Sequence, residues 1–272
     1  MSAGRSLRLG VLGSGKGSNL SAIFHAIREK QLPAEVHIVV SDVAEAGILE
    51  IARAQGVRAE YVPPGDNFRA RLSPESEESI VELLRESGAD LVVLADFGHG
   101  LMQQAVRDFL QDSGVFLALN CQTNSNNHGF NIISRQYRRA DVFSLDEQEI
   151  LLSCGHRHVD FAAELDKLRA HLKARAGWLT RGAVKTIGLD ADGNDAACPP
   201  LGDDITDTIG AGDAFFSVMA LAARNALPVD LTTFLGQLAG AQAVKIVGNR
   251  EPISKSVLLK SGMSLLNRDP AV

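Results

Sequence analysis

The sequence has few cysteines, no excess of positive charge and no long apolar run. Three cysteines, Cys121, Cys154 and Cys198, are spread over 272 residues. Their odd number and wide spacing fit neither a disulfide framework nor the paired ligands of a zinc site, so reduced thiols and a cytoplasmic location are expected. The formal net charge of -6 provides no basic surface for nucleic acid or for an anionic membrane.

No stretch approaches the roughly 18 consecutive apolar residues of a transmembrane helix, and residues 1–8 lack the apolar core of an export signal. The composition instead has the balance of a globular protein, with 45% hydrophobic and 22% charged residues. A chain of this length can bury a substantial core, as one large α/β domain or as two small ones.

Apolar runs alternate with helical periodicity along the first part of the chain. Strands are predicted over 7–12, 36–40, 58–62 and 91–95, and helices over 20–29, 46–55 and 76–87, with a further apolar helix over 236–247. Strands that alternate with helices at this spacing indicate a mainly parallel, doubly wound sheet covered by helices on both faces, which is a three-layer α/β fold.

A glycine-rich loop, Gly-Ser-Gly-Lys-Gly-Ser-Asn over 13–19, follows the first predicted strand. It is not a Walker A motif, because Lys16 is followed by Gly17 instead of the hydroxyl residue that holds magnesium, and it also lacks the Gly-x-Gly-x-x-Gly dinucleotide pattern. Backbone amides and short polar side chains can still hold a phosphate group. The predicted phosphate contacts are Gly15, Gly17, Ser18 and Asn19.

A second candidate anion site is the sequence Gly-Ala-Gly-Asp before an apolar helical segment. Gly210, Ala211 and Gly212 lack bulky side chains and can present backbone N–H groups at a helix start, where anions bind. Asp213 beside them suits phosphoryl transfer, because a carboxylate can accept the proton of an attacking hydroxyl while the amides hold the transferred group. For so short a motif, an ordinary turn with a surface aspartate is the alternative.

The segments VLGSGKGSNLSAI, VVSD and ADLVVLA lie within residues 7–95. They resemble glycinamide ribonucleotide formyltransferase of purine synthesis, in which such a loop holds the substrate phosphate. That family continues with an Asn-x-His-Pro-Ser segment, whereas Asn120 is followed here by Cys-Gln-Thr. Without the histidine, formyl transfer lacks its main proton-transfer and oxyanion partner.

Further motifs follow from residue 90 onward. They are DLVVLADFGHGLM with its Asp-x-Gly-x-Gly, FLALNCQTNSNNHGFNIIS, ADVFSLDEQEI, Thr-Arg-Gly at 180–182 and the segment 207–213. In this order they resemble carbohydrate kinases of the ribokinase superfamily, the phosphofructokinase-B type. The chain is therefore interpreted as a chimera, with a formyltransferase-like half over 1–95 and a kinase-like half over 96–272, and one continuous sheet is expected across the join.

The kinase resemblance implies a role for each matched position. Asp213 becomes the base and 210–212 the anion hole, while Glu147 takes the place of the acid in the family's Asn-x-x-Glu, with Ser144 replacing the Asn, and binds Mg²⁺ through water. A helix-start acid is the alternative for Glu147, and core packing is the alternative for Ala243. The implied nucleotide contacts are Thr180, Arg181, Gly182, Asp207, Thr208, Ala243 and Asn249; the implied substrate contacts are Asp96, Gly98, His99 and Asn120.

These motifs predict an ATP- and Mg²⁺-dependent kinase for a sugar or sugar phosphate, with K⁺ as a further cofactor of the family. The family's sugar-binding segment and lid do not occur in residues 1–90. Two alternatives therefore stay open: a phosphate-ligand enzyme of the formyltransferase type, and a scaffold that binds phosphate or nucleotide without turnover. The expected partners are small-molecule substrate and nucleotide, without nucleic acid or membrane, and a homodimer is the oligomer considered.

Overall fold

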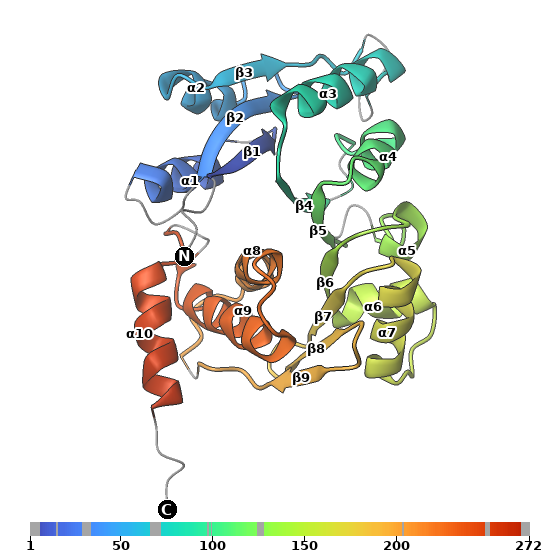
Figure 1. The fold of residues 1–272 in the computed structure, drawn as a ribbon, viewed down its shortest axis with the longest axis vertical. Coiled ribbons are helices and arrows are strands. Elements are labelled where there is room, and N and C mark those ends of the chain that lie inside the picture. The colour runs from blue at the N-terminus through green and yellow to red at the C-terminus, as the bar shows by residue number, and fades with distance from the viewer. Residues whose placement is uncertain are drawn as a thin grey trace, which may run out of the picture. The chain divides into compact units, whose positions relative to one another are not determined.

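The computed structural model describes residues 6–14, 16–28, 34–65, 72–96, 98, 100–123, 128–202, 204–247 and 251–267. The chain forms two compact units. Unit 1 contains Met1–Val92 and Gly98–Leu117, and unit 2 contains Val93–Phe97 and Ala118–Val272. Both units combine mostly parallel strands with flanking helices (Figure 1), so the predicted α/β class is confirmed. Within the described parts of the chain, no helix combines the length and apolar character needed to span a bilayer.

Unit 1 is built on a parallel three-stranded sheet in the order β1-β2-β3. Its elements are β1 (Leu7–Leu12), α1 (Ser18–Arg28), β2 (Ala34–Ser41), α2 (Gly47–Ala54), β3 (Arg58–Tyr61), α3 (Pro74–Ser87) and α4 (Gln104–Asp112). Leu20 and Phe24 of α1 pack with Val39 of the central strand and Leu49 of α2 in one buried cluster. These four apolar side chains fix the helix pair on the sheet.

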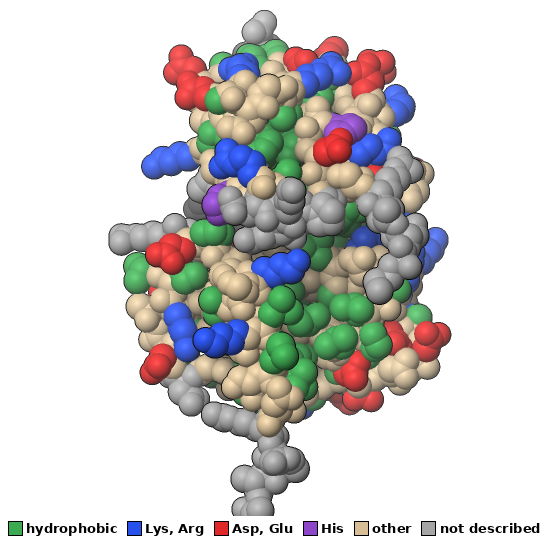
Figure 2. All heavy atoms as spheres, turned by 60° about the vertical axis from the view of Figure 1, so that its left-hand side comes forward, with side chains coloured by type: hydrophobic (Ala, Val, Ile, Leu, Met, Phe, Trp, Pro, Cys, Tyr) green, Lys and Arg blue, Asp and Glu red, His purple; other side chains and the backbone are tan. Residues whose placement is uncertain are grey.

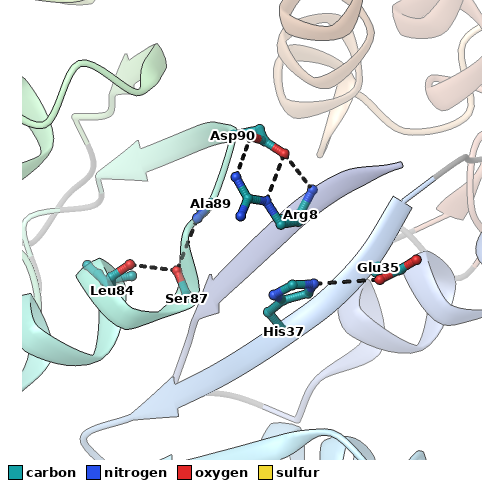
Figure 3. Close-up of polar contacts among 7 residues, drawn as sticks. All are labelled: Arg8, Glu35, His37, Leu84, Ser87, Ala89 and Asp90. Atoms are coloured by element: carbon teal, nitrogen blue, oxygen red, sulfur yellow. Dashed lines mark hydrogen bonds and ion pairs between the residues drawn. The ribbon is translucent and has the colours of Figure 1, made fainter. Parts of the chain in front are cut away.

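The connection from α3 to the next strand is held to β1 by one bidentate ion pair (Figure 3). Helix α3 ends at Gly88, which has the left-handed backbone (φ 58) of a C-terminal cap. Just beyond it, Asp90 accepts hydrogen bonds from the Arg8 side chain at 2.9 and 3.2 Å and from the Arg8 amide at 3.2 Å. The Asp90 amide donates in turn to the Arg8 carbonyl. The start of β1 is therefore fixed to the residue that precedes β4.

Unit 2 contains most of a six-stranded sheet in the order β4-β5-β6-β7-β8-β9. The strands are β4 (Leu91–Asp96), β5 (Phe116–Cys121), β6 (Val142–Asp146), β7 (Ala176–Thr180), β8 (Thr186–Asp190) and β9 (Asp195–Cys198). Strands β5 to β7 run parallel, while β8 and β9 are added antiparallel. The described strands thus form two sheets, where the sequence predicted one continuous sheet.

Helices cover both faces of the unit 2 sheet (Figure 1). One face carries α5 (Ile133–Gln136), α6 (Glu147–Cys154) and α7 (Phe161–His171), and the other carries α8 (Ala211–Arg224) and α9 (Val229–Ala243). The last helix, α10 (Lys255–Leu266), packs on α9. Four apolar side chains of α10 are exposed: Val257, Leu259, Met263 and Leu266. Figure 2 shows apolar side chains gathered on the surface of this unit.

The buried side chain of Trp178 on β7 joins α9 to the sheet. Its indole N–H donates to Thr233 Oγ1 at 2.8 Å, and the Thr233 hydroxyl donates to the Val229 carbonyl at 2.6 Å. A Cβ at Gly188 on β8 would lie 2.6 Å from Thr233 Oγ1, so this position admits only glycine without a shift. Because α8 packs on α9 through contacts such as Phe215 on Gly236, the same core also positions the start of α8.

Candidate functional site

A polar cleft of about 190 Å³ opens in unit 2. It lies where β5, β6 and β7 end beside the first turn of α8. Carboxyl ends of parallel strands meet at one edge of a sheet, and ligands of open α/β folds bind there. The predicted site residues that line the cleft are Asn120, Thr180, Gly210, Gly212 and Asp213.

The start of α8 has the geometry of an anion site. Gly210 is the N-terminal cap and has a left-handed backbone (φ 84), which favours glycine. Gly212 and Asp213 lie in the first turn, where backbone N–H groups have no carbonyl partner within the helix. The amide of Ala211, also predicted to bind the anion, instead donates to the Thr208 carbonyl at 3.3 Å. A Cβ at Gly212 would meet no atom within 4 Å, so space for a ligand lies beside this backbone.

Asp213 lies in that same first turn and is exposed. Its Oδ1 accepts a hydrogen bond of 2.6 Å from Gln122 Nε2, at the end of β5. The segment before it is anchored to α9, because the amides of Thr206 and Asp207 both donate to the Val244 carbonyl, at 2.8 and 3.0 Å. Asp207 also caps the turn, since its Oδ1 accepts from the Ile209 amide. These contacts make Asp207 a support of the loop.

Two acids at the start of α6 form the opposite part of the lining. Asp146 is the N-terminal cap, and its Oδ1 accepts from the Glu149 amide at 2.8 Å, while Glu149 Oε2 accepts from the Asp146 amide at 2.8 Å. The Thr123 amide donates to Glu149 Oε1 at 3.0 Å. Burial of the Glu149 side chain, with a smaller contribution from the Asp146 charge, raises the pKa of Glu149 to about 7 although its two backbone hydrogen bonds oppose this shift.

Glu147, which the sequence suggested as the metal-binding acid, is not among the residues that line the cleft. Arg181 Nε donates to Glu147 Oε2 at 2.7 Å, and the Arg181 guanidinium lies 4.2 Å from the centre of the Phe161 ring. The acids of the α6 start that line the cleft are Asp146 and Glu149, which sequence reasoning did not assign to the site. The spacing Asp-x-x-Glu from Asp146 to Glu149 was a usable signal, because it keeps the four-residue spacing of the family motif and also matches a capping box.

Asp96, predicted to contact substrate, is buried with an exposed fraction of 1%. Its Oδ2 accepts from the Tyr137 hydroxyl at 2.6 Å, and its backbone carbonyl accepts from Asn131 Nδ2 at 2.8 Å. The side chain therefore supports the turns around β4 and β5 and does not line the cleft. Gly98 has a left-handed backbone (φ 67) and belongs to unit 1. His99 lies outside the described residues.

Asn120 is buried in the cleft floor with an unused acceptor. Its Nδ2 donates to the Ser144 carbonyl at 2.9 Å, whereas its Oδ1 has no hydrogen-bond partner among the described residues. Such an acceptor fits a hydroxyl, an amine or a hydrated cation. Thr180 Oγ1 donates to the Leu145 carbonyl at 3.4 Å.

The other predicted nucleotide contacts are less closely tied to the cleft. Gly182 is exposed in a turn (φ 50), and Thr208 is exposed before α8. Ala243 is buried with an exposed fraction of 3%, which agrees with core packing, the alternative to a nucleotide contact. Asn249 lies outside the described residues.

The glycine-rich loop of unit 1 packs against the start of α2. Gly17 has a left-handed backbone (φ 82), and a Cβ there would lie 2.7 Å from Ile48 Cα, so glycine is required. The Ser21 amide donates to the Gly17 carbonyl and begins α1, and Ser14 Oγ donates to Asp42 Oδ1. Gly15 and the side chains of Ser18 and Asn19 lie outside the described residues.

Across the part of the chain that the structure describes, no group of three or more His, Cys, Asp or Glu side chains is placed to hold a metal ion. Asp146, Glu149 and the Asn120 acceptor nevertheless offer oxygen atoms in one cleft. This small donor set fits Mg²⁺, which usually keeps several waters and takes few protein ligands beside substrate phosphates.

Comparisons with known proteins find a formyltransferase likeness in the N-terminal part of the chain and a kinase likeness over most of its length. Residues 7–113 match the Formyl transferase family. Phosphoribosylglycinamide formyltransferase of Haemophilus influenzae is 33% identical over 91 residues, which are 33% of this chain and 41% of that protein. The chain therefore spans less than half the length of this curated relative.

Most of the chain resembles solved structures of kinases. Phosphofructokinase-2 from Escherichia coli in complex with potassium has a TM-score of 0.68 at 14% identity, over 86% of this chain and 83% of that one. Arabidopsis thaliana ribokinase complexed with ribose and ATP has a TM-score of 0.64 at 15% identity, over 94% and 99%. At such identities the likeness shows the fold, which is ribokinase-like. Both resemblances predicted from the sequence are thus confirmed.

Proposed function

We propose that the chain is an ATP-dependent phosphotransferase of the carbohydrate-kinase type, which acts on a hydroxyl of a sugar or sugar phosphate. The observation that carries this proposal is the position of Asp213. It stands in the first turn of α8, next to the open backbone of Gly212, and in the same cleft as Glu149. A base, an anion site and a further acid thus line one small polar cleft.

The chemistry follows from these positions. The acceptor hydroxyl attacks the γ-phosphorus of ATP, a new oxygen–phosphorus bond forms, the bond to ADP breaks, and Asp213 accepts the hydroxyl proton. The first-turn amides of α8 stabilise the charge on the transferred group. Asp146, Glu149 and Asn120 would hold Mg²⁺ through water, and the bound ion would supply positive charge beside the phosphates. The potassium named for the E. coli phosphofructokinase-2 structure supports K⁺ as a further cofactor.

The test is ADP release with MgATP and a panel of sugars and sugar phosphates. Asp213→Asn should lower turnover by at least about 100-fold, because general base catalysis typically contributes that much, and should leave MgATP binding intact. Asp230→Asn is the matched control, since Asp230 is an exposed acid in the first turn of the next helix, outside the cleft. Full turnover by Asp213→Asn would refute the proposal. Stabilisation by MgATP without turnover would favour a non-catalytic scaffold.

The family match over residues 7–113 favours a second candidate, a phosphate-ligand enzyme of the formyltransferase type in unit 1. The loop at 13–19 would hold the phosphate of the substrate through backbone amides at the start of α1. Formyl transfer to glycinamide ribonucleotide from a formyl-folate donor tests it directly. Product formation that survives Asp213→Asn would assign the activity to unit 1.

A further inference from the structure

The two residues that follow β5 contact two of the three carboxylates that line the cleft, those of Asp213 and Glu149. Gln122 Nε2 donates to Asp213 Oδ1 at 2.6 Å, and the Thr123 amide donates to Glu149 Oε1 at 3.0 Å. Asp213 belongs to the first turn of α8, and Glu149 belongs to the first turn of α6. One short segment therefore sets the positions of acids that come from two different helices.

The backbone of Gln122 is itself fixed by buried groups. Its amide donates to the Asp96 carbonyl at 2.9 Å, and its carbonyl accepts from Asn131 Nδ2 at 3.2 Å. Asn131 Nδ2 also donates to the Asp96 carbonyl, and both residues are buried, with exposed fractions of 4% and 1%. The Gln122 side chain thus extends from an ordered base, so its amide has a defined place in the cleft.

A carboxylate with one oxygen held by a donor loses rotational freedom and presents its second oxygen in one direction. Because Asp213 is exposed, packing alone does not fix its side chain, and the Gln122 amide is the contact that orients it. Orientation matters for a base, since a displacement of about 1 Å in a reacting group can cost about 100-fold in rate.

We propose that Gln122 is the positioning residue of the phosphoryl-transfer site. It holds Oδ1 of Asp213, so that Oδ2 is presented to the acceptor hydroxyl. This inference rests on the proposed role of Asp213 as the base. Gln122 itself exchanges no proton in the reaction, and its effect is exerted on kcat through Asp213.

The first test uses two variants of the full chain, Gln122→Leu and Gln122→Glu. Leucine removes the donor, and glutamate keeps the shape of the side chain but places an acceptor where the amide was. Both should lower kcat by about 10- to 100-fold and change the KM for ATP and for the acceptor by less than about threefold. Gln104→Leu is the matched control, because the Gln104 amide also donates to an aspartate, Asp108, but on the surface of α4.

Full kcat in both Gln122 variants, in a protein that Asp213→Asn inactivates, would overturn the inference and leave the proposed function standing. Retained kcat in Gln122→Glu alone would also overturn it, because shape and not the donor would then be what matters. If Asp213→Asn itself kept full turnover, the proposed function would fail and the role of Gln122 with it.

A second measurement does not depend on turnover. The side-chain NH₂ resonance of Gln122, assigned by its loss in Gln122→Leu, should shift in Asp213→Ala and stay unchanged in Asp230→Ala. An unchanged resonance in Asp213→Ala would show that the hydrogen bond is absent and would overturn the inference whatever the enzyme assays give.

Discussion

Glu147 and Arg181 form an ion pair in unit 2, with 2.7 Å between Glu147 Oε2 and Arg181 Nε. The Arg181 guanidinium also stacks on Phe161, so this pair is built on three elements of the unit. Glu149 lies two residues further along α6 and points into the cleft, where its neighbour is Asp146. Acids that are close in sequence therefore have different surroundings, and different experiments should separate them.

We expect Glu149→Gln and Glu147→Gln to differ in their Mg²⁺ dependence. Replacing Glu149 removes a carboxylate from the cleft, so the Mg²⁺ concentration that gives half-maximal stabilisation by ATP should rise by about tenfold or more. Glu147→Gln should change this concentration by less than about twofold, because its carboxylate contacts Arg181. Thermal unfolding with ATP over a Mg²⁺ titration measures both. A larger rise in Glu147→Gln than in Glu149→Gln would instead indicate that Glu147 binds the metal.

Glu149 should make the stability of unit 2 depend on pH. Its pKa is raised from 4.5 to about 7 in the folded chain, so the folded state binds this proton more tightly than the unfolded state. The resulting stabilisation is present below pH 4.5 and is lost as the pH rises through 7. Between pH 5 and 8 the free energy of unfolding should therefore fall, by up to about 3 kcal/mol from this group.

Chemical denaturation at several pH values, followed by tryptophan fluorescence, measures that fall, and Glu149→Gln should flatten it. An equal pH dependence in the variant would assign the effect to other groups. Binding of Mg²⁺ should also weaken below pH 7, because protonation removes the negative charge of Glu149.

Gly212→Ala should separate folding from ligand binding. The added Cβ meets no atom within 4 Å, and alanine is favoured over glycine in a helix by up to about 1 kcal/mol, so the melting temperature should stay equal or rise. The methyl group would occupy the space beside the first-turn amides, and turnover with MgATP should fall by about tenfold or more. Gly210→Ala should instead lose stability, because its backbone is left-handed. Full turnover in Gly212→Ala would mean that no phosphate approaches this turn.

Thr233→Val should destabilise unit 2 by about 1–3 kcal/mol, because it leaves the buried indole N–H of Trp178 without an acceptor. Trp178 is the single tryptophan of the sequence, so its fluorescence reports on unit 2. Denaturant unfolding followed at this tryptophan gives the change directly. A loss below about 0.5 kcal/mol would show that the bond contributes little to the core, and MgATP binding should be unaffected in either case.

The parts of the fold that follow from local patterns could be predicted from the sequence. The predicted strand over 7–12 corresponds to β1, and the helix over 76–87 lies within α3, which Ser73 and Gly88 cap. The helix start at Gly210 and Asp213 could also be predicted locally. Gly210 has a left-handed backbone at the cap, and Asp213 lies in the first turn, where acids are favoured.

The direction in which each helix side chain points, and the contacts between residues distant in sequence, could not be predicted from the sequence. Glu147 and Glu149 lie two positions apart on α6, yet the first contacts Arg181 and the second lines the cleft. The capping box that holds Glu149 depends on side-chain geometry, which the sequence does not show. Gln122 donates a hydrogen bond to Asp213, which is 91 positions away in the sequence. The Asp96 carboxylate accepts one from the Tyr137 hydroxyl. Gly236, the predicted start of a helix over 236–247, instead lies inside α9, where its missing side chain leaves room for Phe215.

The reciprocal bonds between Asp146 and Glu149 begin helix α6, so the acids of the cleft also belong to the scaffold. Loss of such a cap costs about 1 kcal/mol, a sizeable share of the stability of a domain. Selection for folding alone would therefore preserve a hydrogen-bond acceptor at both positions, a role that Asn and Gln can also fill, over generations in which no substrate was turned over. In a lineage that lost activity, mutations would accumulate first at Gly212 and Gln122, and these positions would record the history of catalysis more faithfully than the acids do.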